Sequence, residues 1–303
     1  MTRKLLVLMV AVLLAVAVQA RELTWSYVVP AVANAGGSLD TDWHTDLTIY
    51  NPHNYNLPMV IQFLQAGRDN SHGAPTIDNF EIYPWETLSF WDVLGPNGFD
   101  RRGQTGSLLV YVDDLKRTCT THDCDIAVFA RTYTLNPNGG SGEFGQAIPG
   151  VPSNLGLDCS VLAFMPQVME DHDFRTNAGV VSLTNALVTV RFELQDKDGR
   201  IIHRIDKLLL PYGHTQWHID RGVTGGTLAA FIQAGPSNAV VVPYASVVNN
   251  ATGDPVNLEA HMTPVGVSAQ GPSALSSSER VHGSFPLREP VAGLGIVRQQ
   301  QRP

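Results

Sequence analysis

The chain contains two similar stretches of sequence, one in each half, whose matching segments occur in the same order. Val28-Val29-Pro30-Ala31-Val32 in the first half corresponds to Phe164-Met165-Pro166-Gln167-Val168 in the second. A repeated order is typical of duplicated domains, because each copy forms the same structural unit. Further pairs are Trp43-His-Thr-Asp46 with Phe174-Arg-Thr-Asn177, Tyr83-Pro-Trp-Glu-Thr-Leu-Ser-Phe90 with Leu210-Pro-Tyr-Gly-His-Thr-Gln-Trp217, Gly106-Ser-Leu-Leu109 with Gly226-Thr-Leu-Ala229, and Thr132-Tyr-Thr-Leu-Asn136 with Ser246-Val-Val-Asn-Asn250.

The spacing between matched residues shrinks steadily along the chain. It falls from 136 residues between Val28 and Phe164 to 114 residues between Thr132 and Ser246. The first copy must therefore carry extra residues, and turn-forming composition places them in residues 67–75, 96–104 and 116–125.

Both copies are patterned as short strands rather than as helices. Brief apolar or alternating runs rich in Val, Ile, Thr and aromatic residues are separated by turn-forming clusters such as Asn138-Gly-Gly140. Residues 188–195 alternate between apolar and polar side chains and turn at Asp198-Gly199 into residues 200–210, which predicts a hairpin. The other predicted strands are residues 45–50, 58–65, 106–112, 126–134, 226–234 and 239–248.

These patterns predict an all-β fold of two tandem antiparallel β-sandwich domains of immunoglobulin-like size. Only 16% of the residues are charged, and 27 Gly and 19 Pro supply turns, as expected for such a protein. The domains are expected at residues 21–150 and 151–264, joined near Pro149-Gly-Val-Pro-Ser153. Residues 265–303 lack periodicity and are expected to form a disordered tail.

The N-terminus has the pattern of a secretory signal peptide. Arg3 and Lys4 precede an apolar run over residues 5–18, and Val18-Gln19-Ala20 offers a small-residue cleavage site. The alternative is an uncleaved anchor, but a membrane-spanning helix needs about 20 apolar residues and this run is shorter. We therefore expect residues 1–20 to be removed, leaving a secreted or periplasmic protein without a transmembrane anchor.

The charge of the expected mature chain argues against two classes of partner. Removal of Arg3 and Lys4 leaves 18 basic against 28 acidic side chains, a net charge of −10. Nucleic acids and anionic lipids select basic surfaces, so neither is expected as a main partner.

One further pattern resembles a known group of proteins. Its elements are Val29-Pro30-Ala31-Val32, residues 43–52, Ala130-Arg-Thr-Tyr133 and residues 142–149. Over residues 27–263 the chain is similar to uncharacterised secreted bacterial proteins with tandem β-sandwich domains. The resemblance implies a fold and an exported location, and no chemistry or site residues. The second copy departs from it, with Asn177 and Ser182 in place of Asp46 and Asn51.

Two of the three cysteines are close in sequence. Cys119 and Cys124 flank a short loop, and exported pairs of this kind tend to oxidise, so a structural disulfide is expected. A metal or redox pair with His122 and Asp123 is the alternative, but the second pair that such sites usually need is missing. Cys159 is expected to be buried as a small apolar residue.

One acidic segment is a candidate calcium site. Asp40, Asp42, His44 and Asp46 place potential ligands at alternate positions, and the three carboxylates are the candidate ligands of a weak calcium site, although the same spacing describes the solvent face of a strand. No metal site is assigned from these patterns. His214 and His218 share a spacing seen in metal-binding helices, but on a strand they lie about 13 Å apart.

Several aromatic residues occupy matched positions in the two copies. Trp85, Trp91, Tyr212 and Trp217 either belong to the sandwich cores or, if exposed, form a surface for sugar rings or a protein partner.

The sequence marks no catalytic constellation. A nucleophile elbow and a phosphate-binding glycine loop are both missing, so a non-catalytic role is favoured over an enzyme. We expect an exported binding or structural protein of the envelope or extracellular space, with polysaccharide or an envelope protein as partner. One alternative is an extracellular polysaccharide hydrolase with carboxylates in the interdomain cleft; another is part of a calcium-stabilised adhesin.

Overall fold

The computed structural model describes residues 23–120, 122–136, 140–264 and 285–291 of the 303-residue chain. Within these residues the protein is all-β, with several antiparallel sheets, no α-helix and one 3-10 turn, η1 (Ser153–Leu155). The described part of the chain holds no helix with the length and apolar character needed to cross a membrane. The predicted signal peptide, residues 1–20, lies outside the described residues.

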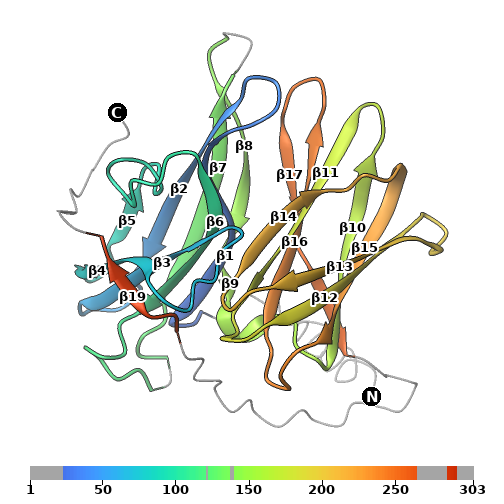
Figure 1. Ribbon diagram of the computed structural model, residues 1–303. Coiled ribbons are helices and arrows are strands. Elements are labelled where there is room, and N and C mark those ends of the chain that lie inside the picture. Colours follow the sequence, from blue (N-terminus) through green and yellow to red (C-terminus); the bar gives the residue numbers. More distant parts are fainter. Residues whose placement is uncertain (1–22, 121, 137–139, 265–284, 292–303) are drawn as a thin grey trace, which may run out of the picture.

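The first half forms two layers of strands in a sandwich-like arrangement (Figure 1). One layer has the order β4-β3-β6-β1 and the other the order β5-β2-β7-β8. Ala35 and Gly36 pair with Trp43 and Asp42, so the end of β1 joins the two layers. The strands are β1 (Ser26–Gly36), β2 (Asp42–Tyr50), β3 (Leu57–Gln65), β4 (Ala74–Ile82), β5 (Thr87–Phe90), β6 (Gln104–Val112), β7 (Ala127–Leu135), β8 (Glu143–Pro149) and β9 (Val151–Pro152).

The second half has the same order of strands, each counterpart nine places later in the numbering. Its layers are β13-β12-β15-β10, extended by β18, and β14-β11-β16-β17. The predicted hairpin is confirmed as β12 and β13, with Gly199 in the left-handed region at a φ of 78°. The strands are β10 (Val161–Glu170), β11 (Phe174–Ser182), β12 (Val188–Gln195), β13 (Ile201–Leu209), β14 (His214–His218), β15 (Val223–Ala234), β16 (Val241–Asn249), β17 (Pro255–Leu258) and β18 (His261–Pro264).

The first matched motif corresponds to a bulge in both halves. The pairing of β1 with β6 shifts register between Val29 and Val32, and that of β10 with β15 shifts after Pro166. Proline donates no backbone hydrogen bond, and within sheets it is tolerated at such irregularities. This explains why Pro30 and Pro166 occupy the middle of the two motifs.

Burial explains why some strands are continuously apolar and others alternate. In β12 every second residue is buried, because only one face covers a core. In β3 nearly every residue is buried: Met59, Ile61 and Phe63 enter the core of the first half, while Val60 and Leu64 face the second half.

The two halves pack against each other through a third apolar cluster. Val28, Val60 and Tyr111 of the first half meet Val181, Tyr212 and Val242 of the second. Hydrogen bonds reinforce this contact, since Asn70 donates its backbone N–H to the Pro211 carbonyl at 3.0 Å and its side-chain amide to the Tyr212 carbonyl at 3.0 Å. The extra loop predicted over residues 67–75 therefore has a structural role: it contacts the second half.

Part of the predicted tail, residues 285–291, belongs to the described residues. Residues 285–291 return to the first half, where β19 (Arg288–Pro290) pairs in parallel with β4 (Figure 1). The expectation of disorder is wrong for this segment, because Phe285 packs on the apolar cluster between the halves and Arg288 pairs with the buried Asp113. Residues 265–284 and 292–303 lie outside the described residues.

Candidate functional site

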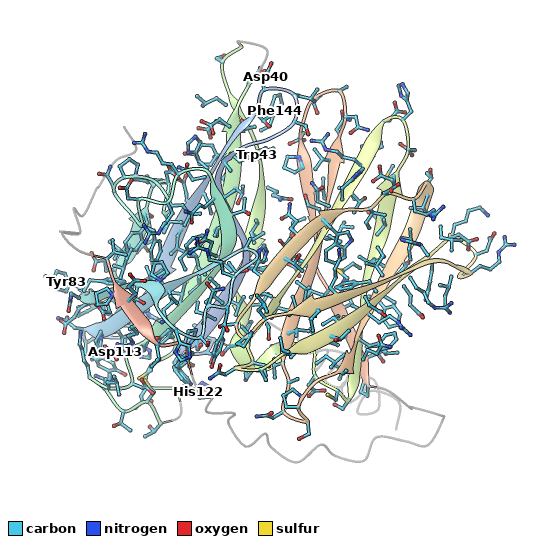
Figure 2. The ribbon with its side chains drawn as sticks, viewed as in Figure 1. Asp40, Trp43, Tyr83, Asp113, His122 and Phe144 are labelled. Carbon is cyan, nitrogen blue, oxygen red and sulfur yellow. A yellow bond between two sulfur atoms is a disulfide. The ribbon has the colours of Figure 1, made fainter. Side chains whose placement is uncertain are left out.

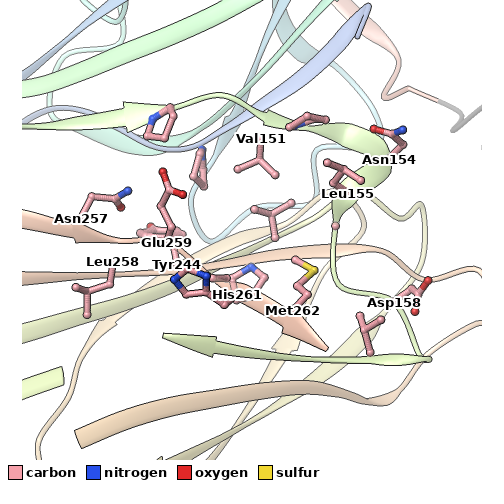
Figure 3. Close-up of a pocket in the computed structure, with 18 residues that line it drawn as sticks. Val151, Asn154, Leu155, Asp158, Tyr244, Asn257, Leu258, Glu259, His261 and Met262 are labelled. Atoms are coloured by element: carbon pink, nitrogen blue, oxygen red, sulfur yellow. The ribbon is translucent and has the colours of Figure 1, made fainter. Parts of the chain in front are cut away.

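Two cavities lie between the halves, and Tyr244 of β16 lines both of them. The first has a volume of about 510 Å³ and is mostly apolar, with Val151, Leu155 and Met262 in its wall (Figure 3). Its acidic and imidazole lining residues are Asp158, Glu259 and His261, of which Glu259 extends into the space in Figure 3. Asp158 is already engaged, because its carboxylate accepts hydrogen bonds from the backbone N–H and hydroxyl of Ser160 at 2.7 and 2.6 Å.

The second cavity, of about 460 Å³, has a more polar character. The first half contributes Trp43 and Gln146 to its wall, and the second half contributes residues on β11, β14 and β16. Among the described residues that line it there is no Asp or Glu. The second-half side chains with hydrogen-bonding groups are Arg175, Asn177, Gln216, His218, Tyr244 and Ser246. We call this space the polar cavity.

Trp43 is placed at the polar cavity by the tight connection between β1 and β2. Gly37 donates its backbone N–H to the Thr41 carbonyl at 2.8 Å, and the Trp43 ring lies over Gly37. A Cβ atom on Gly37 would lie 2.5 Å from the indole nitrogen, so only glycine lets the ring take this position. Figure 2 shows Trp43 at the same end of the molecule as Asp40 and Phe144. The ring is half-buried, leaving part of its surface for a ligand.

A buried network fixes Tyr244 between the two cavities. Its hydroxyl lies 2.7 Å from Nε2 of His214 and donates to Oε1 of Gln216 at 2.9 Å. The ring lies over Gly179, where a Cβ would meet it at 2.2 Å. Burial lowers the pKa of His214 to about 4 and raises that of Tyr244, so both are neutral at pH 7.

Arg175 and His218 belong to a second polar network around Glu170. The Glu170 carboxylate accepts from the Thr176 backbone N–H at 2.8 Å and lies 2.9 Å from Nε2 of His218. Arg175 donates from Nη1 to Asn250 at 2.9 Å. Burial lowers the pKa of the Arg175 guanidinium and the charge of Glu170 opposes this shift, so Arg175 remains a cation.

The amides at the polar cavity retain hydrogen-bonding capacity for a ligand. Ser246 donates its hydroxyl to Oε1 of Gln146 at 2.9 Å, and this bond joins the two halves. It uses the oxygen of the Gln146 amide and so fixes the direction of the NH₂ group of the same side chain. The side chain of Asn177 makes no hydrogen bond to another described residue. The cavity therefore combines the rings of Trp43 and Tyr244 with amide, imidazole and guanidinium groups, which together can donate and accept hydrogen bonds.

The three carboxylates of the suggested calcium site are not brought together. Asp40 lies exposed in the turn before β2, whereas Asp46 is buried and accepts from the Asp92 backbone N–H at 2.9 Å. Asp42 lies 3.4 Å from Nε2 of His44, whose Nδ1 lies 3.0 Å from Asp92. In the described part of the chain, no group of three or more His, Cys, Asp or Glu residues is arranged to hold a metal ion.

The four aromatic residues do not form one surface. Trp85 is 61% exposed, but Tyr212 is 2% exposed and packs between the halves. Trp217 packs on Phe192 with ring centroids 4.8 Å apart, and Trp91 is half-buried. Of the two alternatives, burial therefore holds for Tyr212, whose turn is held against the first half by Asn70, and the alternative of an exposed surface does not hold for this residue.

The disulfide between Cys119 and Cys124 is confirmed, with Cα atoms 5.5 Å apart. Cys124 is buried in the core of the first half, which anchors the loop. The expectation of burial is wrong for Cys159, which is exposed. The hydrogen bonds from Ser160 to Asp158 form a tight turn that leaves Cys159 at its tip.

Of the residues that line the polar cavity, the sequence pattern drew attention only to His218 as a possible ligand, through its spacing from His214, and it did not predict a site there. Trp43, Arg175 and Asn177 do fall inside one matched pair of segments, Trp43-His-Thr-Asp46 and Phe174-Arg-Thr-Asn177. The repeat marks both segments as strands, but only the packing of the halves makes them face one cavity.

Comparison with protein-family models, with curated proteins and with solved structures finds no match. The chemistry of the cavities is therefore the basis for assigning a function.

Proposed function

We propose that this protein is an exported, non-catalytic binding protein that takes carbohydrate into the polar cavity between two immunoglobulin-like sandwiches. The cavity's lining carries the proposal. Sugars offer apolar C–H faces that pack on an aromatic ring and hydroxyls that both donate and accept hydrogen bonds. Trp43 supplies the ring, while Gln146, Asn177, Gln216 and His218 supply matched donors and acceptors.

The duplicated sandwich is supported by the strand pairing of the two halves. Both have the same order of strands in two layers, and both carry a proline-containing bulge in the first strand. The turns at Trp85 and Tyr212, which match in sequence, both place the aromatic residue in the left-handed region, with φ values of 59° and 48°. The two-layer arrangement of short antiparallel strands in each half supports the proposal of immunoglobulin-like units.

Export is supported by the disulfide and by the N-terminal pattern. Cys119–Cys124 is a bond that persists in oxidising compartments. The charged start, apolar run and small-residue cleavage site of residues 1–20 would direct the chain there.

The hydrolase alternative draws less support from the same cavities. Glycoside hydrolysis ordinarily uses two carboxyl groups about 5–10 Å apart, facing the bond to be cleaved. The described lining of the polar cavity offers none. In the apolar cavity Asp158 is held in its own turn by Ser160, which leaves Glu259 as the one carboxylate extending into the space.

The proposal is tested by a binding screen of the chain beginning at Arg21 against immobilised glycans and cell-envelope fractions. We expect retention on at least one polysaccharide, with no release of reducing ends over prolonged incubation. Binding only to envelope proteins would overturn the carbohydrate assignment, and release of reducing ends would favour the hydrolase.

A further inference from the structure

The segment over residues 285–291 lies on the first half as a peptide lies in a receptor groove. Arg288, Glu289 and Pro290 pair in parallel with Ala74, Pro75 and Thr76. Backbone bonds extend the contact on both sides: Leu287 donates to the Ser71 carbonyl at 3.1 Å, and Val291 donates to the Thr76 carbonyl at 2.9 Å. Extended peptides are commonly recognised by adding a strand to a sheet edge in this way.

The segment supplies hydrogen-bond partners to buried polar groups beneath it. Gln62, which is fully buried, donates its amide to the Pro286 carbonyl at 3.0 Å and accepts from the Tyr111 hydroxyl at 3.0 Å. The carboxylate of Asp113, which is 1% exposed, accepts hydrogen bonds from both terminal nitrogens of Arg288 at 3.0 and 3.3 Å. Without an occupant, these groups would lose partners that are costly to leave unpaired.

An aromatic anchor completes the groove. The Phe285 ring stacks on Tyr111, with centroids 4.0 Å apart and planes 3° apart, and meets the edge of Trp25 at 5.8 Å. The groove thus binds an extended segment in which an aromatic residue (Phe285) is followed by a proline (Pro286) and, two positions after the proline, by an arginine (Arg288). These features are specific enough to select a peptide, and the chain itself supplies one.

We propose that this groove is an exchangeable peptide-binding site and that β19 of a second copy of this chain can occupy it. Residues 265–284 separate β18 of the second half from the segment, and a connection of that length spans at most roughly 70 Å. A strand on so long a connection makes identical contacts whether it comes from its own chain or from another, which is the condition for swapping. Exchange would link exported copies to one another.

Exchange depends on concentration. Tethering within one chain gives a segment an effective concentration on the order of mM at its own groove. Intramolecular occupancy therefore dominates in dilute solution, and exchange grows as the protein becomes concentrated.

Engineered cysteines can trap the exchanged pair. In a Cys159→Ser background, Pro75→Cys is introduced into one full-length protein and Glu289→Cys into another, because the two positions are paired between β4 and β19. The two proteins are mixed at increasing concentration under mild oxidation. A matched control replaces the Pro75→Cys protein with Asp198→Cys, in the exposed hairpin turn of the second half.

We expect a covalent heterodimer that increases with concentration, exceeds the Asp198→Cys control several-fold and is suppressed by an excess of a synthetic peptide spanning residues 285–291. A third protein carrying both Pro75→Cys and Glu289→Cys should close within one chain. If it closes but the mixed proteins yield no more heterodimer than the control, the segment does not exchange. If it fails to close, the groove assignment itself is overturned.

Discussion

At the scale of single residues, the ion pair between Arg288 and Asp113 gives a pH-dependent contribution to stability. Burial raises the pKa of the Asp113 carboxyl, but the hydrogen bonds and charge of Arg288, together with the Leu115 backbone N–H and the charge of Lys116, hold this pKa below its ordinary value of 3.8. A carboxyl whose pKa is lowered in the folded state contributes stability that is fully present above its unfolded pKa. This stability is lost as the pH falls through the folded pKa.

We therefore expect Arg288→Ala to lower the free energy of unfolding by about 1–3 kcal/mol at pH 7. The difference between the variant and the parent should stay constant down to pH 5 and shrink below pH 4, as Asp113 becomes protonated. Urea unfolding across this range measures it. A difference that persists unchanged at pH 2 would contradict the assignment.

The buried His214 predicts a second pH effect at higher pH. Its folded pKa of about 4 lies below the ordinary 6.5, so its neutral form contributes stability that is present above pH 6.5 and is lost progressively towards pH 4. The loss should reach about 3 kcal/mol. His214→Gln keeps a neutral hydrogen-bonding group beside Tyr244 and should remove this slope from chemical unfolding curves; an equal slope in both proteins would show that another group is responsible.

At the scale of structural elements, the loop closed by Cys119 and Cys124 is held by its disulfide and by contacts to the first half. Tyr55 donates its hydroxyl to the Asp123 carbonyl at 2.8 Å. For so short a loop, the chain-entropy model gives about 2 kcal/mol of stabilisation.

Replacing both cysteines with serine should therefore lower the free energy of unfolding by about 2 kcal/mol. Denaturant titration gives this value directly. The matched control is Cys159→Ser, which removes the exposed thiol and should change stability by less than about 0.5 kcal/mol.

Most of the strands could be predicted because each half-buried strand shows its own pattern. The alternation in β12 and the turn at Gly199 specify a hairpin locally. β19 could not be predicted, since Arg288-Glu289-Pro290 has no apolar alternation and pairs with a strand more than 200 residues earlier in the sequence. Its stability comes from Asp113 and Tyr111, whose positions depend on the folded first half.

The polar cavity could not be predicted from the sequence either. Trp43 and Asn177 lie on strands of different halves, and they share a wall only because the halves pack through Val28, Tyr111 and Tyr212. Periodicity identifies the buried face of one sandwich, but it carries no information about which outer faces meet.

At the scale of the whole molecule, the apolar cluster between the halves should make them unfold together. Tyr212→Ala removes a large buried ring from this cluster and should cost about 3–5 kcal/mol. Calorimetry should show one transition in the parent protein and a lower or divided transition in the variant.

Trp85→Ala is the matched control for Tyr212→Ala. It truncates an exposed aromatic residue with the same left-handed backbone at the corresponding turn of the first half, and should change stability by less than about 0.5 kcal/mol. Equal melting of the two variants would mean that the junction contributes little.

The carbohydrate assignment is tested most directly by calorimetric titration of the best glycan from the screen into the parent protein, Trp43→Ala and Trp85→Ala. Both variants lose one indole ring, but only Trp43 lines the polar cavity. We predict that Trp43→Ala weakens binding at least tenfold, or about 1.4 kcal/mol, while Trp85→Ala binds like the parent. Unchanged affinity in folded Trp43→Ala, or an equal loss in both variants, would contradict carbohydrate binding at the polar cavity.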